Sequence, residues 1–215
     1  MIRDVSSNEL FTILILFGIA IIAVAKLVAP KRFEDFLYVI GNFKYLKIYS
    51  REQKFFDNFD ALLFINLIIS VSIFSFIIYQ HITGIQNVSI NLIFKLTIGI
   101  GSFILIKVLI ERLIGSIFEI DKIIDAYLFQ KISYKNYLGL VLLPLNALLL
   151  FSFKNSLSLV YIIITLILIV NIIGLITSIK THLNLIKGNF FYFILYLCAL
   201  EITPYIILYK VFIDR

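Results

Sequence analysis

Residues 193–210 read FILYLCALEITPYIILYK, and this run decides the class of fold. A stretch of this length and composition is typical of a helix that crosses the roughly 30 Å hydrocarbon layer of a membrane. It nevertheless carries an acid, Glu201, close to its middle and a proline, Pro204, three positions later. The role of a carboxylate at such a depth is the main question that the sequence raises.

The rest of the chain has the same apolar character. Of its 215 residues, 61% are hydrophobic and only 15% are charged, and the mean hydropathy is +1.05. These are too few polar side chains to cover a water-exposed surface. We therefore expect residues 1–215 to form a single integral membrane domain.

Six apolar stretches are long enough to cross a bilayer. They cover residues 10–28, 61–79, 90–110, 137–153, 157–179 and 190–211. None shows the period-two alternation of a barrel strand, so each is predicted to be a helix. The first lacks the basic start and the cleavage site of a signal peptide, and we expect it to be retained. The predicted fold is an all-α bundle of six transmembrane helices.

The cations are distributed unevenly between the two sides of this predicted bundle. Thirteen of the 19 Lys and Arg residues lie on one side: twelve fall between the first and second, third and fourth, and fifth and sixth spans, and Lys26 lies near the end of the first span on the same side. By the positive-inside rule these regions face the cytoplasm, which places both termini in the periplasm. The formal net charge of +6 therefore reflects membrane topology, and we expect no nucleic-acid partner.

Two segments on the predicted cytoplasmic side, residues 32–40 and 117–127, have the spacing of amphipathic helices. Their apolar positions are Phe33, Phe36, Leu37 and Ile40 in the first segment and Ile117, Ile120, Ile124 and Tyr127 in the second. We interpret both as interfacial helices at the headgroup boundary. The alternatives are that they extend the spans and pack on the bundle, or that they form a partner-binding surface.

Glu201 lies about 18 Å from the start of its predicted helix at 1.5 Å per residue, near the bilayer centre. An acid at this depth costs about 2.5–3.5 kcal/mol on insertion scales, so its side chain must face protein or water. Pro204 cannot donate a hydrogen bond to the carbonyl oxygen of Leu200. We therefore expect the helix to kink beside the acid and to leave a backbone acceptor free.

Other polar or helix-breaking positions inside the spans are candidate partners for Glu201. They are Lys107, Pro144, Asn146 and Asn171. Asn146 and Asn171 lie at depths comparable to that of Glu201, whereas Lys107 lies near the cytoplasmic end and would have to reach inward. We interpret the set as a polar centre that fixes helix packing. A proton or ion site, and a contact with lipid or a partner, are the alternatives.

Two pairs of aspartates have a spacing that could hold Mg²⁺. Asp57 with Asp60, and Asp121 with Asp125, lie on the predicted cytoplasmic side, where polyprenyl and alcohol-phosphate transferases bind the metal of their substrates. Neither pair has the fuller acidic motif of those enzymes, and the sequence contains no P-loop, HExxH or Ser-His-Asp pattern. The lone Cys198 and the two histidines, which lie on opposite sides of the membrane, form no shared site. We expect no cofactor.

Three stretches carry a resemblance to a known family: residues 106–118 (IKVLIERLIGSIF), 138–152 (LGLVLLPLNALLLFS) and 191–210 (FYFILYLCALEITPYIILYK). The chain resembles the Bacteroidota inner-membrane family catalogued as domain of unknown function 4271, over nearly its whole length. The resemblance implies a multi-pass inner-membrane protein of a Gram-negative envelope, with no activity established for the family. The recurring positions that it implies here are Lys107, Pro144, Tyr196, Cys198, Glu201 and Pro204.

The sequence holds few recognisable catalytic groups. This favours a non-catalytic subunit or accessory protein of an envelope complex, of the secretion, motility or outer-membrane biogenesis type. Its expected partners are membrane lipids and another inner-membrane protein. The first alternative is a proton-coupled or small-solute carrier that uses Glu201. The second is a Mg²⁺-dependent lipid-modifying enzyme.

Overall fold

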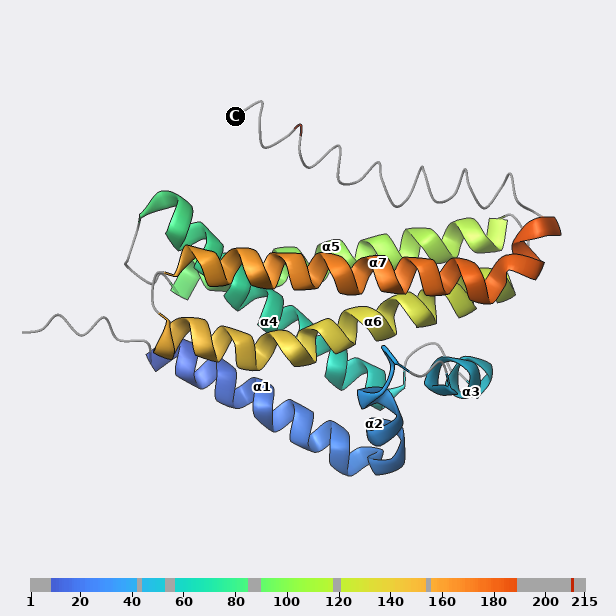
Figure 1. Cartoon of the computed structure of the whole chain (residues 1–215), viewed down its shortest axis with the longest axis horizontal. Helices are drawn as coiled ribbons and strands as arrows, with labels where there is room; N and C mark the ends of the chain where they lie inside the picture. The colour runs from blue at the N-terminus through green and yellow to red at the C-terminus, as the bar shows by residue number, and fades with distance from the viewer. Residues whose placement is uncertain are drawn as a thin grey trace, which may run out of the picture.

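The computed structural model describes residues 9–41, 44–52, 57–84, 90–117, 121–153, 156–188 and 210. Within these ranges every regular element is a helix, as Figure 1 shows. Five long helices run alongside one another: α1 (Glu9–Val28), α4 (Asn58–Thr83), α5 (Ile90–Ile117), α6 (Asp121–Ala147) and α7 (Leu157–Gly188). Two short helices, α2 (Pro30–Leu37) and α3 (Lys44–Glu52), lie at one end, and a turn of π-helix, η1 (Leu148–Ser152), continues α6.

The all-α prediction is confirmed, and five of the described helices are long and apolar enough to cross a membrane. These spans are Glu9–Val28, Asn58–Thr83, Ile90–Ile117, Ile124–Ser152 and Leu157–Gly174. They overlap the first five stretches that the sequence predicts. Of the predicted sixth span, residues 190–211, only Lys210 is among the described residues, so the count of six stays a prediction.

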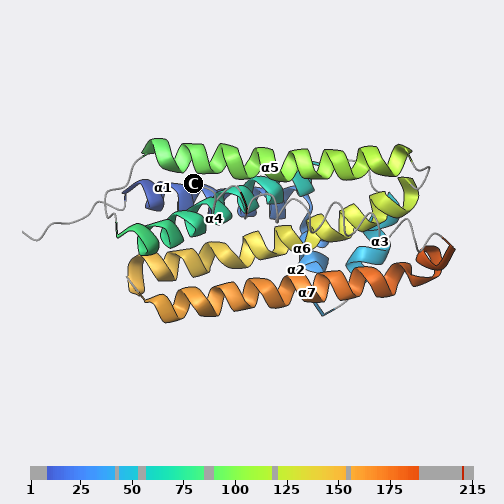
Figure 2. The same cartoon turned by 90° about the horizontal axis from the view of Figure 1, so that it is seen from above.

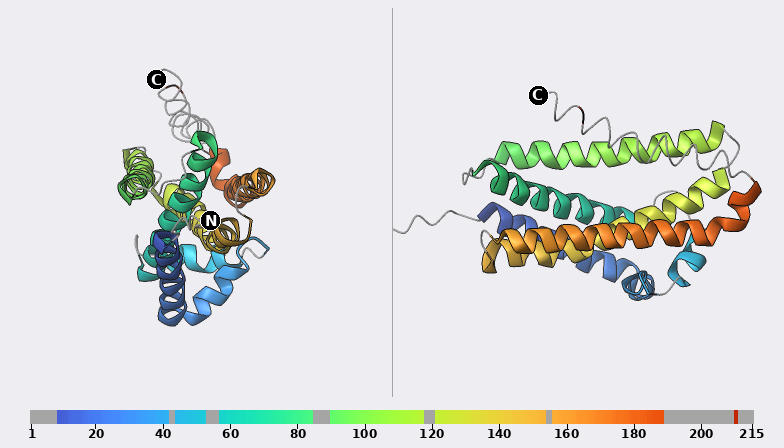
Figure 3. Two further views of the ribbon diagram at one scale, coloured as in Figure 1. Left: turned by 90° about the vertical axis from the view of Figure 1, so that its left-hand side faces the viewer. Right: turned by 45° about the horizontal axis from the view of Figure 1, so that its top comes forward.

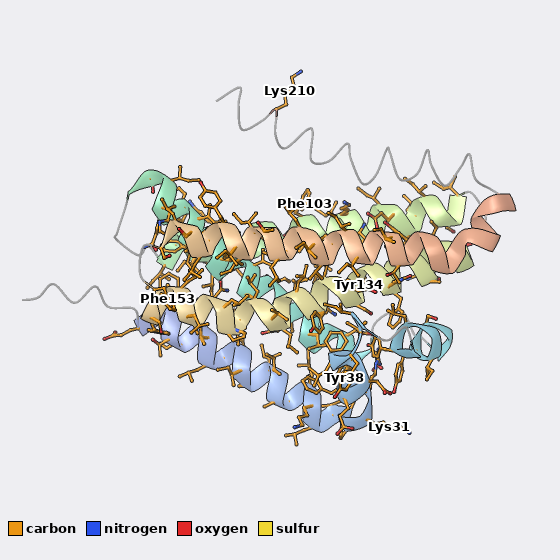
Figure 4. All side chains as sticks on the ribbon, in the orientation of Figure 1. Lys31, Tyr38, Phe103, Tyr134, Phe153 and Lys210 are labelled. Atoms are coloured by element: carbon orange, nitrogen blue, oxygen red, sulfur yellow. The ribbon has the colours of Figure 1, made fainter. Side chains whose placement is uncertain are left out.

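The chain runs back and forth through the bundle (Figures 1 and 2). The end of α1, the start of α4, the end of α5 and the start of α6 all lie near α2 and α3. We call this end of the bundle the capped end and the opposite one the far end. Tyr38 and Lys31 lie at the capped end and Phe153 at the far end (Figure 4). α4 and α6 therefore run parallel to each other.

α4 is the most enclosed of the spanning helices. Within its most apolar window 61% of the residues are buried, compared with 28% for α1, 22% for α5 and 17% for α7. Viewed along the bundle, α4 and α6 lie between α1, α5 and α7 (Figure 3). Because lipid tails are as apolar as these side chains, such helices are held together by close packing and polar contacts more than by hydrophobic burial.

The closest approach between α4 and α6 occurs at Gly139. A Cβ atom added there would lie 2.6 Å from the Cα atom of Leu67, which is a backbone atom that cannot turn aside. Glycine at this position therefore allows the two helix backbones to touch, as small residues do at many helix crossings in membranes.

We expect Gly139→Ala to lower the free energy of unfolding by about 1–3 kcal/mol, the usual cost of forcing an extra group into a packed interface. Gly99→Ala is the matched control, since a Cβ atom there meets nothing within 4 Å. It should raise stability by up to about 1 kcal/mol, because alanine is the better helix former. Unfolding of both variants in mixed micelles measures the difference. If Gly139→Ala and Gly99→Ala change the free energy of unfolding equally, the α4–α6 contact is not closely packed at Gly139.

Of the predicted segment 117–127, residues 118–120 lie outside the described residues, and the rest belongs to the two spanning helices. α5 ends at Ile117, α6 begins at Asp121, and Ile124 and Tyr127 are buried in the first turns of α6. They pack in a small cluster with Val108 of α5. Of the alternatives that the spacing left open, extension of the spanning helices is the one observed.

The segment 32–40 forms a separate short helix, α2, up to Leu37. Ile40, past the end of α2, is partly buried against the same cluster as Phe33 and Phe36. Phe33 and Phe36 are buried, whereas Leu37 is exposed. α3 follows it and was not predicted, since KYLKIYSRE contains no long apolar run. It packs against both α2 and α6. Together α2 and α3 form a helical cap on the bundle.

Candidate functional site

The predicted polar centre is only partly within the described residues. Glu201 and Pro204 lie outside them, so their predicted roles stay predictions. Asn146 is fully buried and its Nδ2 atom donates a hydrogen bond of 2.8 Å to the carbonyl oxygen of Ser70 on α4. This bond joins the last turn of α6 to the middle of α4.

Asn171 and Pro144 lie apart from that contact. The Nδ2 atom of Asn171 donates a hydrogen bond of 2.8 Å to the carbonyl oxygen of Ile167 on its own helix, and the residue is exposed. Pro144 lies inside α6 and is exposed as well. It is followed one turn later by the π-turn, where the N–H group of Phe153 donates to the carbonyl oxygen of Leu148 at 2.9 Å. A proline and a π-turn so close together are typical of a helix that is locally widened.

Lys107 belongs to a different group of polar residues, which we call the charged triad: Lys107 and Glu111 on α5 and Lys131 on α6. The Nζ atom of Lys131 donates to Oε1 of Glu111 at 2.6 Å. The Nζ atom of Lys107 lies 3.9 Å from the same oxygen. The side chains of Lys107, Glu111 and Lys131 are 6%, 0% and 12% exposed. Two cations therefore share one buried carboxylate.

The position of the charged triad explains how a membrane helix tolerates it. Glu111 lies six residues before the end of α5, which is about 9 Å from the capped end. It is therefore close to the headgroup boundary, where charged side chains are less costly than at the bilayer centre. The Oε2 atom of Glu111 is buried and has no hydrogen-bond partner among the residues that the structure describes. The signal for this group in the sequence is the Lys-x-x-x-Glu spacing within α5.

Asp57 and Asp60 converge on an arginine of the cap. The guanidinium group of Arg32 on α2 bonds to a carboxylate oxygen of Asp57 through Nη1 and donates to Oδ2 of Asp60 through Nη2 at 2.7 Å. Its Nε atom donates to the Tyr45 hydroxyl at 3.5 Å. We call these four residues the Arg32 clamp, and they tie α2, α3 and the start of α4 together.

Aromatic rings enclose the Arg32 clamp. The guanidinium carbon lies 4.8 Å from the ring centroid of Phe59 and 5.2 Å from that of Tyr49, within the range of cation–π attraction. Phe36 packs against the ring of Tyr45 at 5.5 Å and that of Phe59 at 5.9 Å. The cap is therefore a packed structure with its own aromatic core.

Electrostatics keep the Arg32 clamp charged. Burial lowers the pKa of Arg32, but Tyr45, Asp60 and Asp57 raise it, and the net shift is upward. Burial also raises the pKa of the Tyr45 phenol, and the Asp60 carboxylate raises it further. Arg32 is thus a cation and Tyr45 a neutral phenol at neutral pH. In this state the two aspartates serve as counter-ions, and a metal ion would have to displace Arg32 to bind them.

The second aspartate pair is more open. Oδ1 of Asp125 lies 3.5 Å from Nε of Arg112, and both side chains are substantially exposed. Asp121 is exposed at the start of α6. Within the described ranges no three His, Cys, Asp or Glu side chains come together in a way that could hold a metal ion.

A bundle of long apolar helices that encloses amide and charged side chains defines an α-helical membrane protein. The chain belongs to the family described as Domain of unknown function (DUF4271), whose model matches residues 11–212. The resemblance read from the sequence is therefore confirmed. Comparison with curated proteins and with solved structures gave no match.

Proposed function

We propose that this protein is a non-catalytic subunit of an envelope complex in the inner membrane of a Gram-negative bacterium, and that it holds a partner protein at its capped end. The packed cap supports this proposal. Arg32 is bonded to three side chains from two other elements of the chain, so α2 and α3 are fixed on the bundle. A rigid extramembrane platform of this kind suits docking better than turnover.

The exposed side of the cap has the composition of an interface. Tyr38 is 70% exposed, Leu37 41% and Ile48 39%, and Lys31 beside them is exposed too. We call these four residues the cap surface. Aromatic and apolar side chains with a basic rim are typical of protein interfaces. By the positive-inside rule the cap faces the cytoplasm, because most of the Lys and Arg residues lie on its side.

A photo-crosslinking residue at position 38, in native membranes, should form an adduct with one partner that also co-purifies stoichiometrically in mild detergent. Tyr38→Asp should reduce recovery of that partner more than about tenfold, as for an aromatic hot spot, with membrane levels unchanged. The control is a crosslinker at Phe153, which is exposed at the far end. Adducts with lipid alone at position 38, or an unchanged complex in Tyr38→Asp, would overturn the proposal.

The charged triad supports a second candidate, a proton- or ion-coupled carrier. Ionisable residues inside membrane bundles often lie on ion pathways, and Glu111 combines full burial with a second oxygen that no described residue binds. The carrier first inferred from Glu201 rests on a residue outside the described ranges. A Mg²⁺-dependent enzyme is less well supported, because Arg32 occupies Asp57 and Asp60.

A further inference from the structure

Asn66 stands in the middle of α4 with its side chain fully buried. Neither its Oδ1 nor its Nδ2 atom has a hydrogen-bond partner among the described residues. The same holds for Oγ of Ser70, one turn further along α4, and for Oδ1 of Asn146 on α6. Buried amides and hydroxyls in folded proteins are almost always hydrogen-bonded, either to protein or to water.

The surroundings show that lipid does not reach this place. A Cβ atom at Gly18 of α1 would lie 3.2 Å from Oδ1 of Asn66 and 2.3 Å from Cδ1 of Leu143 on α6. The backbone of α1 therefore passes directly against the Asn66 amide, and the side chain of Leu143 fills the space that a side chain at Gly18 would take. Gly18 lies near the midpoint of Glu9–Val28, so the amide is near the middle of the membrane.

We propose that Asn66, Ser70 and Asn146 bind internal water between α1, α4 and α6. The chemistry of the unbonded atoms identifies the ligand. The amide and hydroxyl oxygens can accept hydrogen bonds, and the N–H₂ group of Asn66 can donate them. A metal cation would bind the oxygens but repel Nδ2 of Asn66. A water molecule accepts from the amide nitrogen and donates to the oxygens. Exchanging the Oδ1 and Nδ2 assignments of Asn66 changes nothing, because both atoms are unbonded.

The water site is enclosed on both sides along the bundle. On the far side it is closed by a cluster of buried apolar side chains, namely Phe11, Ile15, Ile73, Phe76, Leu149 and Leu150. On the capped side lies a second apolar cluster that includes Leu63 and Leu138, next to the contact in which Nδ2 of Asn136 donates to the carbonyl oxygen of Asp60 at 3.5 Å. The bound water is therefore held inside the bundle. The binding of internal water is a property separate from the proposed docking of a partner, and it does not depend on that function.

The test is magnetisation transfer from water to nitrogen-bound protons, measured by solid-state NMR on the full chain in lipid bilayers. Transfer to the Asn66 side-chain amide should be several-fold faster than transfer to the backbone amides of Ile73 and Phe76 in the apolar cluster. The side-chain amide signal of Asn66 should be missing from the spectrum of Asn66→Leu, and this loss assigns the signal in the unmodified chain. Ser70→Ala, which removes one oxygen from the site, should slow the transfer while Asn136 keeps its own rate.

If Asn66→Leu does not accumulate, sequential correlation in the unmodified chain assigns the signal and Ser70→Ala carries the test alone. Transfer to Asn66 as slow as to Ile73 and Phe76 would overturn the proposal. So would an Asn66 signal that shifts in Glu201→Gln while remaining isolated from water, because the partner would then be the carboxyl group of this same chain.

Discussion

Glu111→Leu is expected to lower the free energy of unfolding by about 3–5 kcal/mol, the cost of removing one partner from a buried ion pair. The substitution fits the space with an apolar side chain but leaves Lys107 and Lys131 close together with no carboxylate between them. Their repulsion should separate α5 from α6, which meet through this contact. Unfolding of purified protein in mixed micelles, followed by circular dichroism, measures the loss.

A double variant identifies the origin of that loss. Glu111→Leu combined with Lys131→Met removes the anion and its closest cation together, and it should recover at least half of the stability, because well-packed apolar groups replace buried ion pairs at little cost. If the double variant is no more stable than Glu111→Leu, the carboxylate was not compensating the lysines. The ion pair would then be incidental to stability.

Glu111→Gln separates the two candidate functions. Gln keeps the shape and a hydrogen-bond acceptor for Lys131 but cannot bind or release a proton at physiological pH. A docking subunit should keep its partner in this variant. A carrier that titrates Glu111 should be folded and inactive in proton flux across proteoliposomes. Loss of the partner complex in a folded Glu111→Gln protein would contradict the docking proposal.

The spanning helices were predictable because a bilayer leaves an apolar stretch of about 20 residues few structures other than a helix. The same reasoning requires a protein partner for the Asn146 amide, which donates to the carbonyl oxygen of Ser70. Its predicted contact with Glu201 stays a prediction. Asn171 shows the limit of that rule. Its amide is bonded to the carbonyl oxygen one turn earlier in its own helix, and such a local bond satisfies the donor without any neighbour. Polarity alone does not reveal which of these solutions an asparagine adopts.

The charged groups were harder to place from the sequence. Arg32 counted as one of many cytoplasmic cations, yet it binds acids 25 and 28 residues away. Glu111 was not singled out from the sequence, and its closest cation is 20 residues further along the chain. Both interactions depend on how helices pack, and hydropathy carries no information about that. The aspartate spacing that suggested Mg²⁺ instead serves an arginine.

Arg32→Met is expected to cost about 3 kcal/mol and to release the cap from the bundle. It removes the counter-ion of Asp60, whose side chain is only 10% exposed, and unpaired buried carboxylates are strongly destabilising. It also removes the cation–π contacts with Phe59 and Tyr49. Because the Arg32 clamp supplies the ion pairs that join α2 to the start of α4, we expect α2 and α3 to open while the spanning helices persist. Hydrogen exchange by mass spectrometry should show faster exchange in residues 30–52 and little change in residues 61–80.

Arg112→Met is the matched control for this experiment. It removes the same type of side chain from the same end of the bundle, but its pair with Asp125 is exposed, with side chains 41% and 48% accessible. Exposed pairs contribute about 0–1 kcal/mol because water and salt screen them, so exchange in the cap should be unchanged. Arg32→Lys keeps the charge but loses the planar guanidinium group that reaches two carboxylates at once. Its rate of hydrogen exchange in the cap should lie between those of Arg32→Met and Arg112→Met. If Arg32→Met leaves exchange in the cap as slow as Arg112→Met does, the aromatic core alone holds α2 and α3 in place. The docking platform would then not depend on the Arg32 clamp.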